Sequence, residues 1–449
     1  MGDEEKTRTA RGFLRRARGA LSGLRPEAAD TVPPDEAAAT SAMLGELGAT
    51  LLASSQATSD VEETLVRLAT RYDRSDLRVF VLPTVVLIDD ERAQGAGTTF
   101  FPAGREALRL DQAGKIERLV QRAFDEQPPP EEIVADVRAL RVAPARFGTL
   151  LSLLGYTLLT VGFGLVLNPT VTALPVYLVL GVVVGIIVLV GSRAPTLSLI
   201  LPVATAFLVT LLITVLVRPI VHDDVLRLVA PSLVSFLPGL TLTIAAVELT
   251  SGQVMAGGSR LVYGVARLGL LAFGVFAGIS VGGTPPAPTT QPEQLGSWAP
   301  WAGIALVSVG YYLYSAAPRR SLPWILYALL VAYSAQLLGD RLLGPELSGL
   351  VGAIIVIPAV ALAGRIRSAP STAIMLTCAY WLLVPGAMGF IGLSEAASGT
   401  SGATETILRT FGSLMAIAIG MVIGAGLSRD VSTVARGWRR ARTEEGSTP

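Results

Sequence analysis

The chain has 449 residues, of which 51% are hydrophobic and only 16% charged, and its mean hydropathy is +0.56. Soluble globular proteins carry about 25% charged residues, so this composition excludes an ordinary soluble enzyme. A net charge of +1 gives no basis for binding nucleic acid. With one cysteine and one histidine, a disulfide framework and a Cys/His metal site are both excluded. We therefore expect a membrane protein without metal or cofactor.

Residues 1–40 are predicted to be a separate N-terminal segment. Arginines are frequent between Ala10 and Leu24, which favours either a disordered tail or a basic amphipathic helix at the membrane surface. No continuous apolar core is present, so the segment does not resemble a secretory signal. The N-terminus should remain in the cytoplasm.

Residues 41–145 are predicted to form a cytoplasmic α/β domain. Apolar residues recur at helical spacing from Leu44 to Leu68, and helices are also predicted over residues 115–126 and 130–140. The β-branched segment 78–89 predicts one strand that either bends at Pro83 or lies at the edge of a sheet, and a second strand near residues 98–101 would close a hairpin.

Ten apolar runs follow, and most approach the roughly 20 residues needed to cross a bilayer. They are residues 150–167, 175–190, 197–217, 225–247, 261–281, 301–316, 323–338, 347–362, 372–390 and 407–427. We divide them into a first five-helix repeat (146–281), an extracellular Pro-rich linker (282–300) and a second five-helix repeat (301–427). A basic tail (428–449) completes the chain. Arginines are more frequent in the loops and tail that would then face inward, which places both termini in the cytoplasm.

Two segments of these runs repeat the same residues at the same spacing. Pro238-Gly239 is followed by Glu248 and Ser251-Gly252; further along the chain, Pro385-Gly386 is followed by Glu395 and Ser398-Gly399. Five predicted spans separate the two segments, so they would cross the bilayer in opposite directions. This is typical of the inverted repeats of secondary transporters. The predicted fold is an all-α polytopic membrane domain of ten transmembrane helices in two inverted five-helix repeats, preceded by the α/β domain.

A Pro-Gly pair inside an apolar span predicts a broken helix. Proline lacks the amide donor and glycine permits non-helical dihedral angles. Broken backbone is tolerated in a bilayer only where protein buries it or where it lines a polar cavity. Two inverted breaks could build a substrate site, although each could instead be a packing kink. The candidate substrate-binding residues are Pro238, Gly239, Thr241, Thr243, Pro385 and Gly386.

Glu248 and Glu395 are candidate coupling residues. Each lies ten residues after its proline, about 15 Å along a helix, so they could lie at the membrane faces or could couple transport to an ion. The sequence contains no GxxxxGK[ST] phosphate loop and no GxSxG nucleophile motif. We therefore expect a protein that is not an enzyme and whose transport is gradient-driven or passive.

Three stretches of sequence resemble one family. They are LGATLLASSQATSDVEETLVRLA (residues 47–69), FLPGLTLTIAAVELTSGQVMAGGSRLVYG (residues 236–264) and LVPGAMGF (residues 383–390). Together with the order of the domains, they resemble the bacterial threonine/serine exporter family. That family more often has aspartate at the position of Glu248.

The resemblance implies a multi-pass protein of the bacterial inner membrane that exports threonine and serine by proton antiport. Its partners would be the amino acid, protons and the lipid bilayer. Related members split into two subunits handle small dicarboxylates, which leaves a second substrate class open. A membrane-anchored regulatory or scaffold protein is a further alternative.

Overall fold

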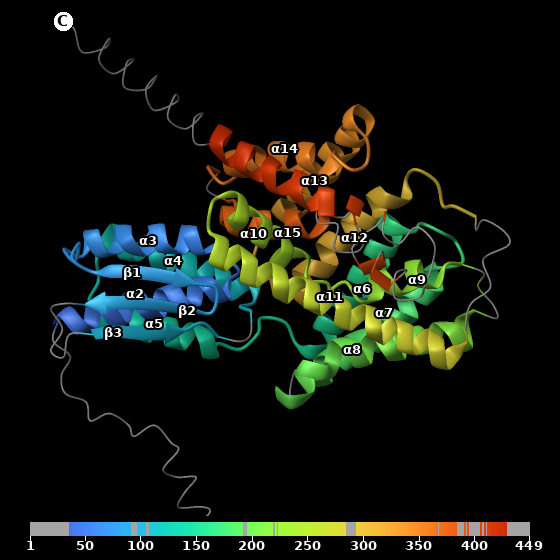
Figure 1. Ribbon diagram of the computed structural model, residues 1–449, viewed down its shortest axis with the longest axis horizontal. Helices are drawn as coiled ribbons and strands as arrows, with labels where there is room; N and C mark the ends of the chain where they lie inside the picture. Colours follow the sequence, from blue (N-terminus) through green and yellow to red (C-terminus); the bar gives the residue numbers. More distant parts are fainter. Residues whose placement is uncertain are drawn as a thin grey trace, which may run out of the picture.

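The computed structural model describes residues 36–90, 97–104, 107–191, 195–218, 221, 223–283, 293–366, 368–383, 390–391, 393–394, 405, 408–409 and 411–428. An α/β unit (residues 36–142) lies at one end of a long bundle of apolar helices (Figure 1). Most of the predicted N-terminal segment, much of the linker and nearly all of the basic tail lie outside the described residues.

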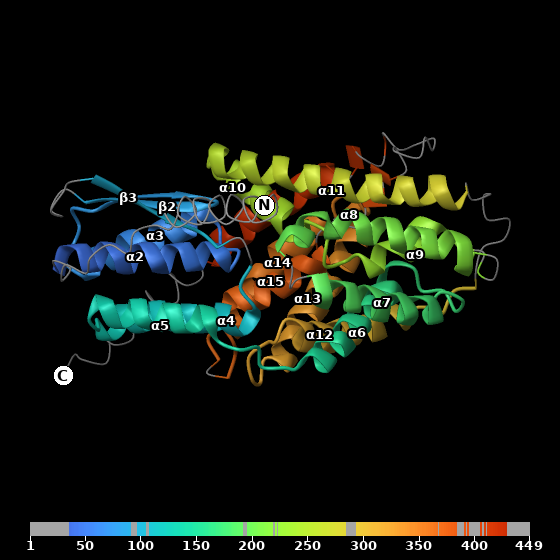
Figure 2. The ribbon, with the colours of Figure 1, turned by 90° about the horizontal axis from the view of Figure 1, so that it is seen from below.

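The α/β unit has three layers (Figure 2). Strands β1 (Arg78–Leu82), β2 (Val85–Asp90) and β3 (Gly97–Pro102) form an antiparallel sheet in the order β1-β2-β3. Helices α2 (Glu36–Ala53) and α3 (Thr58–Arg71) pack on one face of the sheet. Helices α4 (Leu110–Glu126) and α5 (Pro130–Val142) form the third layer.

The position of α2 between the sheet and α5 explains its composition. Leu44, Leu47 and Leu51 are almost completely buried, because this helix has protein on both sides and no polar stripe. Gly45 permits the closest contact with the sheet. A Cβ at this position would lie 2.2 Å from the Phe101 ring, so only glycine fits.

The single strand predicted over residues 78–89 is wrong. The chain reverses at Pro83 and Thr84, and the segment forms β1 and β2 with Leu82 opposite Val85. Proline is well suited to a turn, where its missing amide donor removes no ladder hydrogen bond. The predicted helix over residues 115–126 also begins earlier, at Leu110.

Within the described residues, the apolar bundle contains ten named helices, a π-helical turn and one further helix. They are α6 (Thr149–Leu167), α7 (Leu174–Gly191), α8 (Pro195–Leu212), η1 (Ile213–Val217), α9 (Val225–Ser232), α10 (Gly239–Thr250), α11 (Val254–Gly282), α12 (Ala299–Tyr314), α13 (Leu322–Leu343), α14 (Ser348–Ala363), α15 (Thr372–Leu383) and the helix Phe411–Ser428. Many outward residues, such as Leu178 and Phe273, are exposed and apolar. Such a surface is suited to lipid.

In the part of the chain that the structure describes, six helices are long and apolar enough to cross a membrane. The pair α9 and α10, bent by 67°, makes a seventh and broken candidate. Helices α12 and α14 have 16 residues each and α15 has 12. The protein is thus a multi-pass membrane protein, and the count of ten spans stays a prediction.

Helices α6 and α12 approach each other through paired glycines. A Cβ on Gly155 would lie 2.9 Å from the carbonyl oxygen of Gly310, and one on Gly162 would lie 2.8 Å from that of Gly303. The pairing runs in opposite directions along the two chains, so the helices are antiparallel. In each helix the two glycines are seven residues apart, which places them on one face.

A second type of contact joins parallel helices. A Cβ on Gly274 of α11 would lie 2.6 Å from the Val203 carbonyl oxygen of α8. A Cβ on Gly420 would lie 2.5 Å from the Leu350 carbonyl oxygen of α14. Small residues of this kind allow close backbone approach in membrane helices. The same type of contact thus occurs between α8 and α11 and between α14 and the helix Phe411–Ser428. The two contacted residues, Val203 and Leu350, are separated in the sequence by the same interval as the two Pro-Gly pairs.

Candidate functional site: the helix break and the cytoplasmic junction

The span formed by α9 and α10 is interrupted at the Pro-Gly pair. Helix α9 ends at Ser232, the chain makes turns, and helix α10 begins at Gly239, immediately after Pro238. The Pro238 side chain offers no capping acceptor to the first turn of α10. The amides of this turn have no intrahelical acceptors, and they carry the positive end of the helix dipole.

Tyrosines from two other helices cover this break. The Tyr156 hydroxyl of α6 donates to the Ser232 carbonyl oxygen at 2.8 Å and lies 3.0 Å from Ser235 Oγ. The ring of Tyr314, from α12, packs edge-on against Tyr156 with centroids 5.3 Å apart. The break is therefore buried in protein and has polar groups around it.

Arg267, from the middle of α11, lies near this cluster, and its charge is close enough to act on the Tyr314 hydroxyl. Its Nε atom is buried and has no hydrogen-bond partner in the part of the chain that the structure describes. The sequence analysis missed this residue. The signal was available, because Arg267 is the only charged residue inside the predicted span 261–281.

Two threonines were predicted to face a substrate. Thr243 is buried, and its Oγ1 has no hydrogen-bond partner among the residues described. Buried Thr160 and Thr205 instead donate to the carbonyl four residues earlier, at 3.1 and 2.6 Å. Thr241 is partly buried. Thr243 is thus a polar group for which the helix itself provides no partner.

Glu248 lies at the other end of α10, away from the break. Its Oε1 accepts hydrogen bonds from the Thr58 amide (2.9 Å) and hydroxyl (3.0 Å), and its Oε2 lies 3.3 Å from Arg260 Nε. The carboxylate is completely buried. Because Thr58 is the first residue of α3, the negative charge also interacts favourably with that helix N-terminus. Arg260 Nη2 donates to the Gln56 carbonyl oxygen at 3.2 Å.

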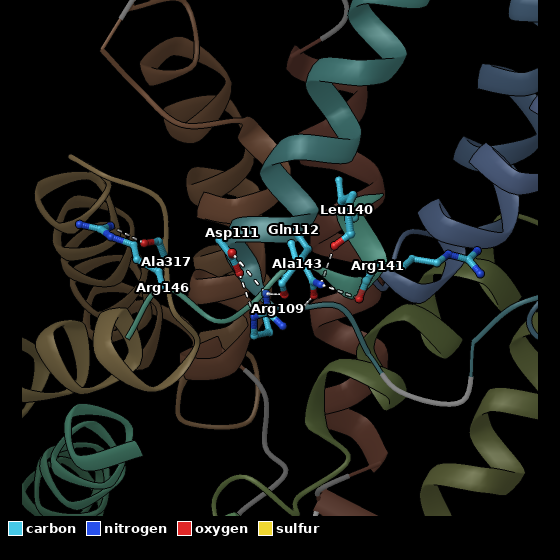
Figure 3. A network of polar contacts seen from close by, with 8 residues as sticks. All are labelled: Arg109, Asp111, Gln112, Leu140, Arg141, Ala143, Arg146 and Ala317. Atoms are coloured by element: carbon cyan, nitrogen blue, oxygen red, sulfur yellow. Dashed lines mark hydrogen bonds and ion pairs between the residues drawn. The ribbon is translucent and has the colours of Figure 1, made fainter. Parts of the chain in front are cut away.

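A second set of contacts joins the α/β unit to the turn between α12 and α13 (Figure 3). Arg109 donates to the carbonyl oxygen of Ala143, the residue after α5, at 2.9 Å and so fixes the end of the α/β unit. Arg146, in the segment that follows, donates to the Ala317 carbonyl oxygen of the turn at 2.9 Å. The Leu110 amide donates to the Ser315 carbonyl oxygen at 3.2 Å. The α/β unit therefore contacts both the α10–α11 turn and the α12–α13 turn.

Comparison with known proteins agrees with the resemblance seen in the sequence. The profile of the ThrE family, described as "Putative threonine/serine exporter", matches residues 42–282, which is more than half of the chain. The chain belongs to this exporter family. The matched segment includes the α/β unit, the break, Glu248 and Arg267. No curated protein and no solved structure matches the chain.

Membership of this family places the chain in a family of membrane transporters. Three predicted site residues, Pro385, Gly386 and Glu395, lie outside the described residues. Helix α15 ends at Leu383, whose carbonyl oxygen accepts a hydrogen bond from Gln336 Nε2 at 3.3 Å. Where the structure is described, no group of three His, Cys, Asp or Glu side chains could hold a metal ion.

Proposed function

We propose that the protein exports threonine and serine across the bacterial inner membrane by exchange with protons, and that the substrate binds at the Pro238-Gly239 break. The observation that carries this proposal is the interrupted α9–α10 span, buried under two tyrosines within the segment that matches the exporter family. In hydrocarbon, unpaired backbone groups cost several kcal/mol each. A polar substrate would give such groups partners.

The packing of the helices supports an inverted repeat as the framework of this transporter. Gly303 follows Gly155 at the same interval in the sequence as Gly310 follows Gly162. The contact of Gly155 with Gly310 is therefore equivalent to that of Gly303 with Gly162. A two-fold axis in the membrane plane that relates the two halves of the chain would exchange α6 and α12, and with them these two glycine contacts. Such an arrangement is expected if α6 and α12 are the first helices of two inverted repeats.

The remaining helices fit the same framework. Helices α9 and α15 begin at Val225 and Thr372, which are separated by the same interval as Pro238 and Pro385, and α10 packs against α15. Pro385 and Gly386 would form the second break, facing the first. Alternating access would then rock one five-helix half against the other.

At the break, the first turn of α10 would attract the substrate carboxylate through its free amides and its dipole. Pro238 and Gly239 shape this turn, and Thr241 and Thr243 follow it. A hydroxyl such as that of Thr243 could pair with a polar group of the substrate. Threonine and serine have a hydroxyl, an ammonium and a carboxylate, and they are small enough for a site between helices.

Proton coupling would involve Glu248 and its counterpart Glu395. Protonation of Glu248 would remove the charge that holds Thr58 and Arg260, and would so loosen the contact between the α/β unit and the α10–α11 turn. The α/β unit contacts Glu248 and Arg260, on either side of the α10–α11 turn, and Ser315 of the α12–α13 turn. With that unit in the cytoplasm, both termini would be cytoplasmic.

The test is efflux from vesicles containing the purified protein and loaded with labelled threonine, serine or a small dicarboxylate. Under an imposed pH gradient, we expect threonine and serine efflux above that of empty vesicles. Pro238→Ala should lower the rate roughly 10- to 100-fold, because the binding groups are displaced. Pro202→Ala is the matched control, since Pro202 lies inside the continuous helix α8.

Two results would contradict the proposal. Absence of efflux of threonine and serine would exclude the function, and efflux of dicarboxylates alone would assign the second substrate class. Efflux by Pro238→Ala at the rate of Pro202→Ala would exclude the break as the binding site.

A further inference from the structure

Arg267 is the charged side chain placed deepest in the long helix α11. It lies near the middle of this 29-residue helix, with about 20 Å of helix on either side. It lies six residues inside the apolar run 261–281, about 9 Å of helix, and its Nε atom is buried. Its charge must therefore be accommodated within the protein.

The described residues provide no acidic partner for this charge. The ion pairs of the membrane part involve Arg227, Arg260 and Arg409, and none includes Arg267. Its Nε is buried and makes no hydrogen bond there. Cationic side chains inside membranes are nearly always paired, and an unpaired one indicates a functional site.

Arg267 lies at the same depth as the break. Helices α10 and α11 run antiparallel, because a Cβ on Gly257 would meet Ala245 and Leu249, whereas one on Gly264 would meet Leu242. The next turn of α11, which carries Arg267, therefore lies beside the first turn of α10. Tyr314 lies within reach of its charge and also interacts with Ser235 of the break.

We propose that Arg267 binds the carboxylate of the transported substrate. This inference rests on the proposed function and names the group that recognises the substrate class, a small solute with a free carboxylate. A guanidinium pairs with a carboxylate through two parallel hydrogen bonds. Tyr156 and Tyr314 exclude water from the pair, and the first turn of α10 adds its amide donors. Binding of a carboxylate would compensate the charge of Arg267, which has no acidic partner among the described residues.

The test compares Arg267→Gln, Arg267→Lys and the control Arg227→Gln in vesicles with labelled threonine and with threoninamide, which lacks the carboxylate. Arg227 is 60% exposed and lies on α9. In the parent protein, threonine should be strongly preferred over threoninamide. Arg267→Gln should raise the apparent KM for threonine roughly 10- to 100-fold, as expected for loss of a hydrogen bond to a charged group, and should abolish the preference.

Arg267→Lys keeps the charge and should retain part of the preference, and Arg227→Gln should retain all of it. Thermal unfolding of the purified proteins gives a second measurement. Threonine should raise the unfolding temperature of the parent protein and of Arg227→Gln, but not that of Arg267→Gln. A preference for threonine that survives in Arg267→Gln would overturn the inference.

The outcomes separate this inference from the proposed function. If the parent protein moves only a small dicarboxylate, the amino-acid assignment fails, and the role of Arg267 is then judged by the loss of dicarboxylate efflux in Arg267→Gln. If the parent protein moves threonine and Arg267→Gln does so with unchanged KM, the proposed function stands and the inference fails.

Discussion

The two ends of α10 differ in how their buried polar groups are satisfied. At the junction with the α/β unit, Glu248 has Thr58 and Arg260 as partners. At the break, Arg267 has no acidic partner and the hydroxyl of Thr243 has no acceptor among the residues that the structure describes. Arg260 and Arg267 are only seven residues apart on α11, so they lie on the same face of one helix, two turns apart.

This difference separates a structural contact from a binding site. A buried charge with its counter-charge in place stabilises one arrangement of the chain and gives a ligand little to do. A buried charge without a counter-charge, as Arg267 is among the described residues, favours the binding of an anion. The substitutions below change one end of α10 at a time.

The largest expected effect is that of Glu248→Ala, which would make the surroundings of Arg260 resemble those of Arg267. Removing one partner of a buried ion pair costs about 3–5 kcal/mol, so the unfolding temperature of the purified protein should fall markedly. Glu346→Ala is the control. Its partner is Arg409 at 3.4 Å and both side chains are more than half exposed, so about 0–1 kcal/mol is expected.

Glu248→Gln tests coupling with a smaller change of shape than Glu248→Ala. The amide oxygen can still accept from Thr58, but the charge paired with Arg260 is lost and the group no longer exchanges a proton. Efflux of this variant should become independent of the imposed pH gradient. A variant that unfolds normally and still responds to the gradient would remove Glu248 from the coupling mechanism.

A smaller effect is expected for Thr243→Val, which should increase the stability of the protein but decrease transport. Valine has a similar shape and removes a buried hydroxyl that lacks a partner among the described residues, so the protein should gain about 1 kcal/mol of stability. Efflux of threonine should decrease if this hydroxyl contacts the substrate. Thr205→Val is the matched control, since the Thr205 hydroxyl donates to the Leu201 carbonyl. It should gain no stability and should leave efflux unchanged.

Much of this architecture could be predicted from periodicity and composition. Apolar runs gave the membrane helices, and Pro238-Gly239 predicted a break that the structure contains, because both signals are local. The interpretation of residues 78–89 as one strand failed because periodicity alone does not show where an apolar segment reverses. Pro83 is compatible with a chain reversal, but proline is equally compatible with a bend or an edge strand, so it did not decide between them.

The partners of Glu248 could not have been predicted in this way. Thr58 is 190 residues away in the sequence, and only the docking of α3 against the α10–α11 turn brings the two together. Arg267 is a different case. Its position inside an apolar span was visible in the sequence. Its closeness to the break depends on the antiparallel packing of α10 and α11, and the contact of Gly264 with Leu242 that shows this packing is seen only in the structure.

The smallest expected effect concerns Glu117, a carboxyl group at the contact between the α/β unit and the second half of the bundle. One turn before it in α4, a Cβ on Gly114 would lie 2.9 Å from Ile374 of α15 and 3.5 Å from Pro318. Burial raises the pKa of Glu117 above its ordinary value of 4.5, and neighbouring Ser371 and Arg118 act in the opposite direction.

A raised pKa means that the folded protein binds this proton more tightly than the unfolded chain does. The contribution of Glu117 to stability is therefore fully present below pH 4.5 and decreases as the pH rises through the raised pKa. Glu117→Gln keeps a neutral group at all pH values and should flatten this part of the pH dependence, whereas Glu131→Gln, at an exposed position of α5, should not. Unfolding temperatures measured for the three proteins from pH 4.5 to neutral pH test this. An identical pH dependence in the parent protein and Glu117→Gln would mean that protonation of Glu117 does not affect the stability of the α4 contact.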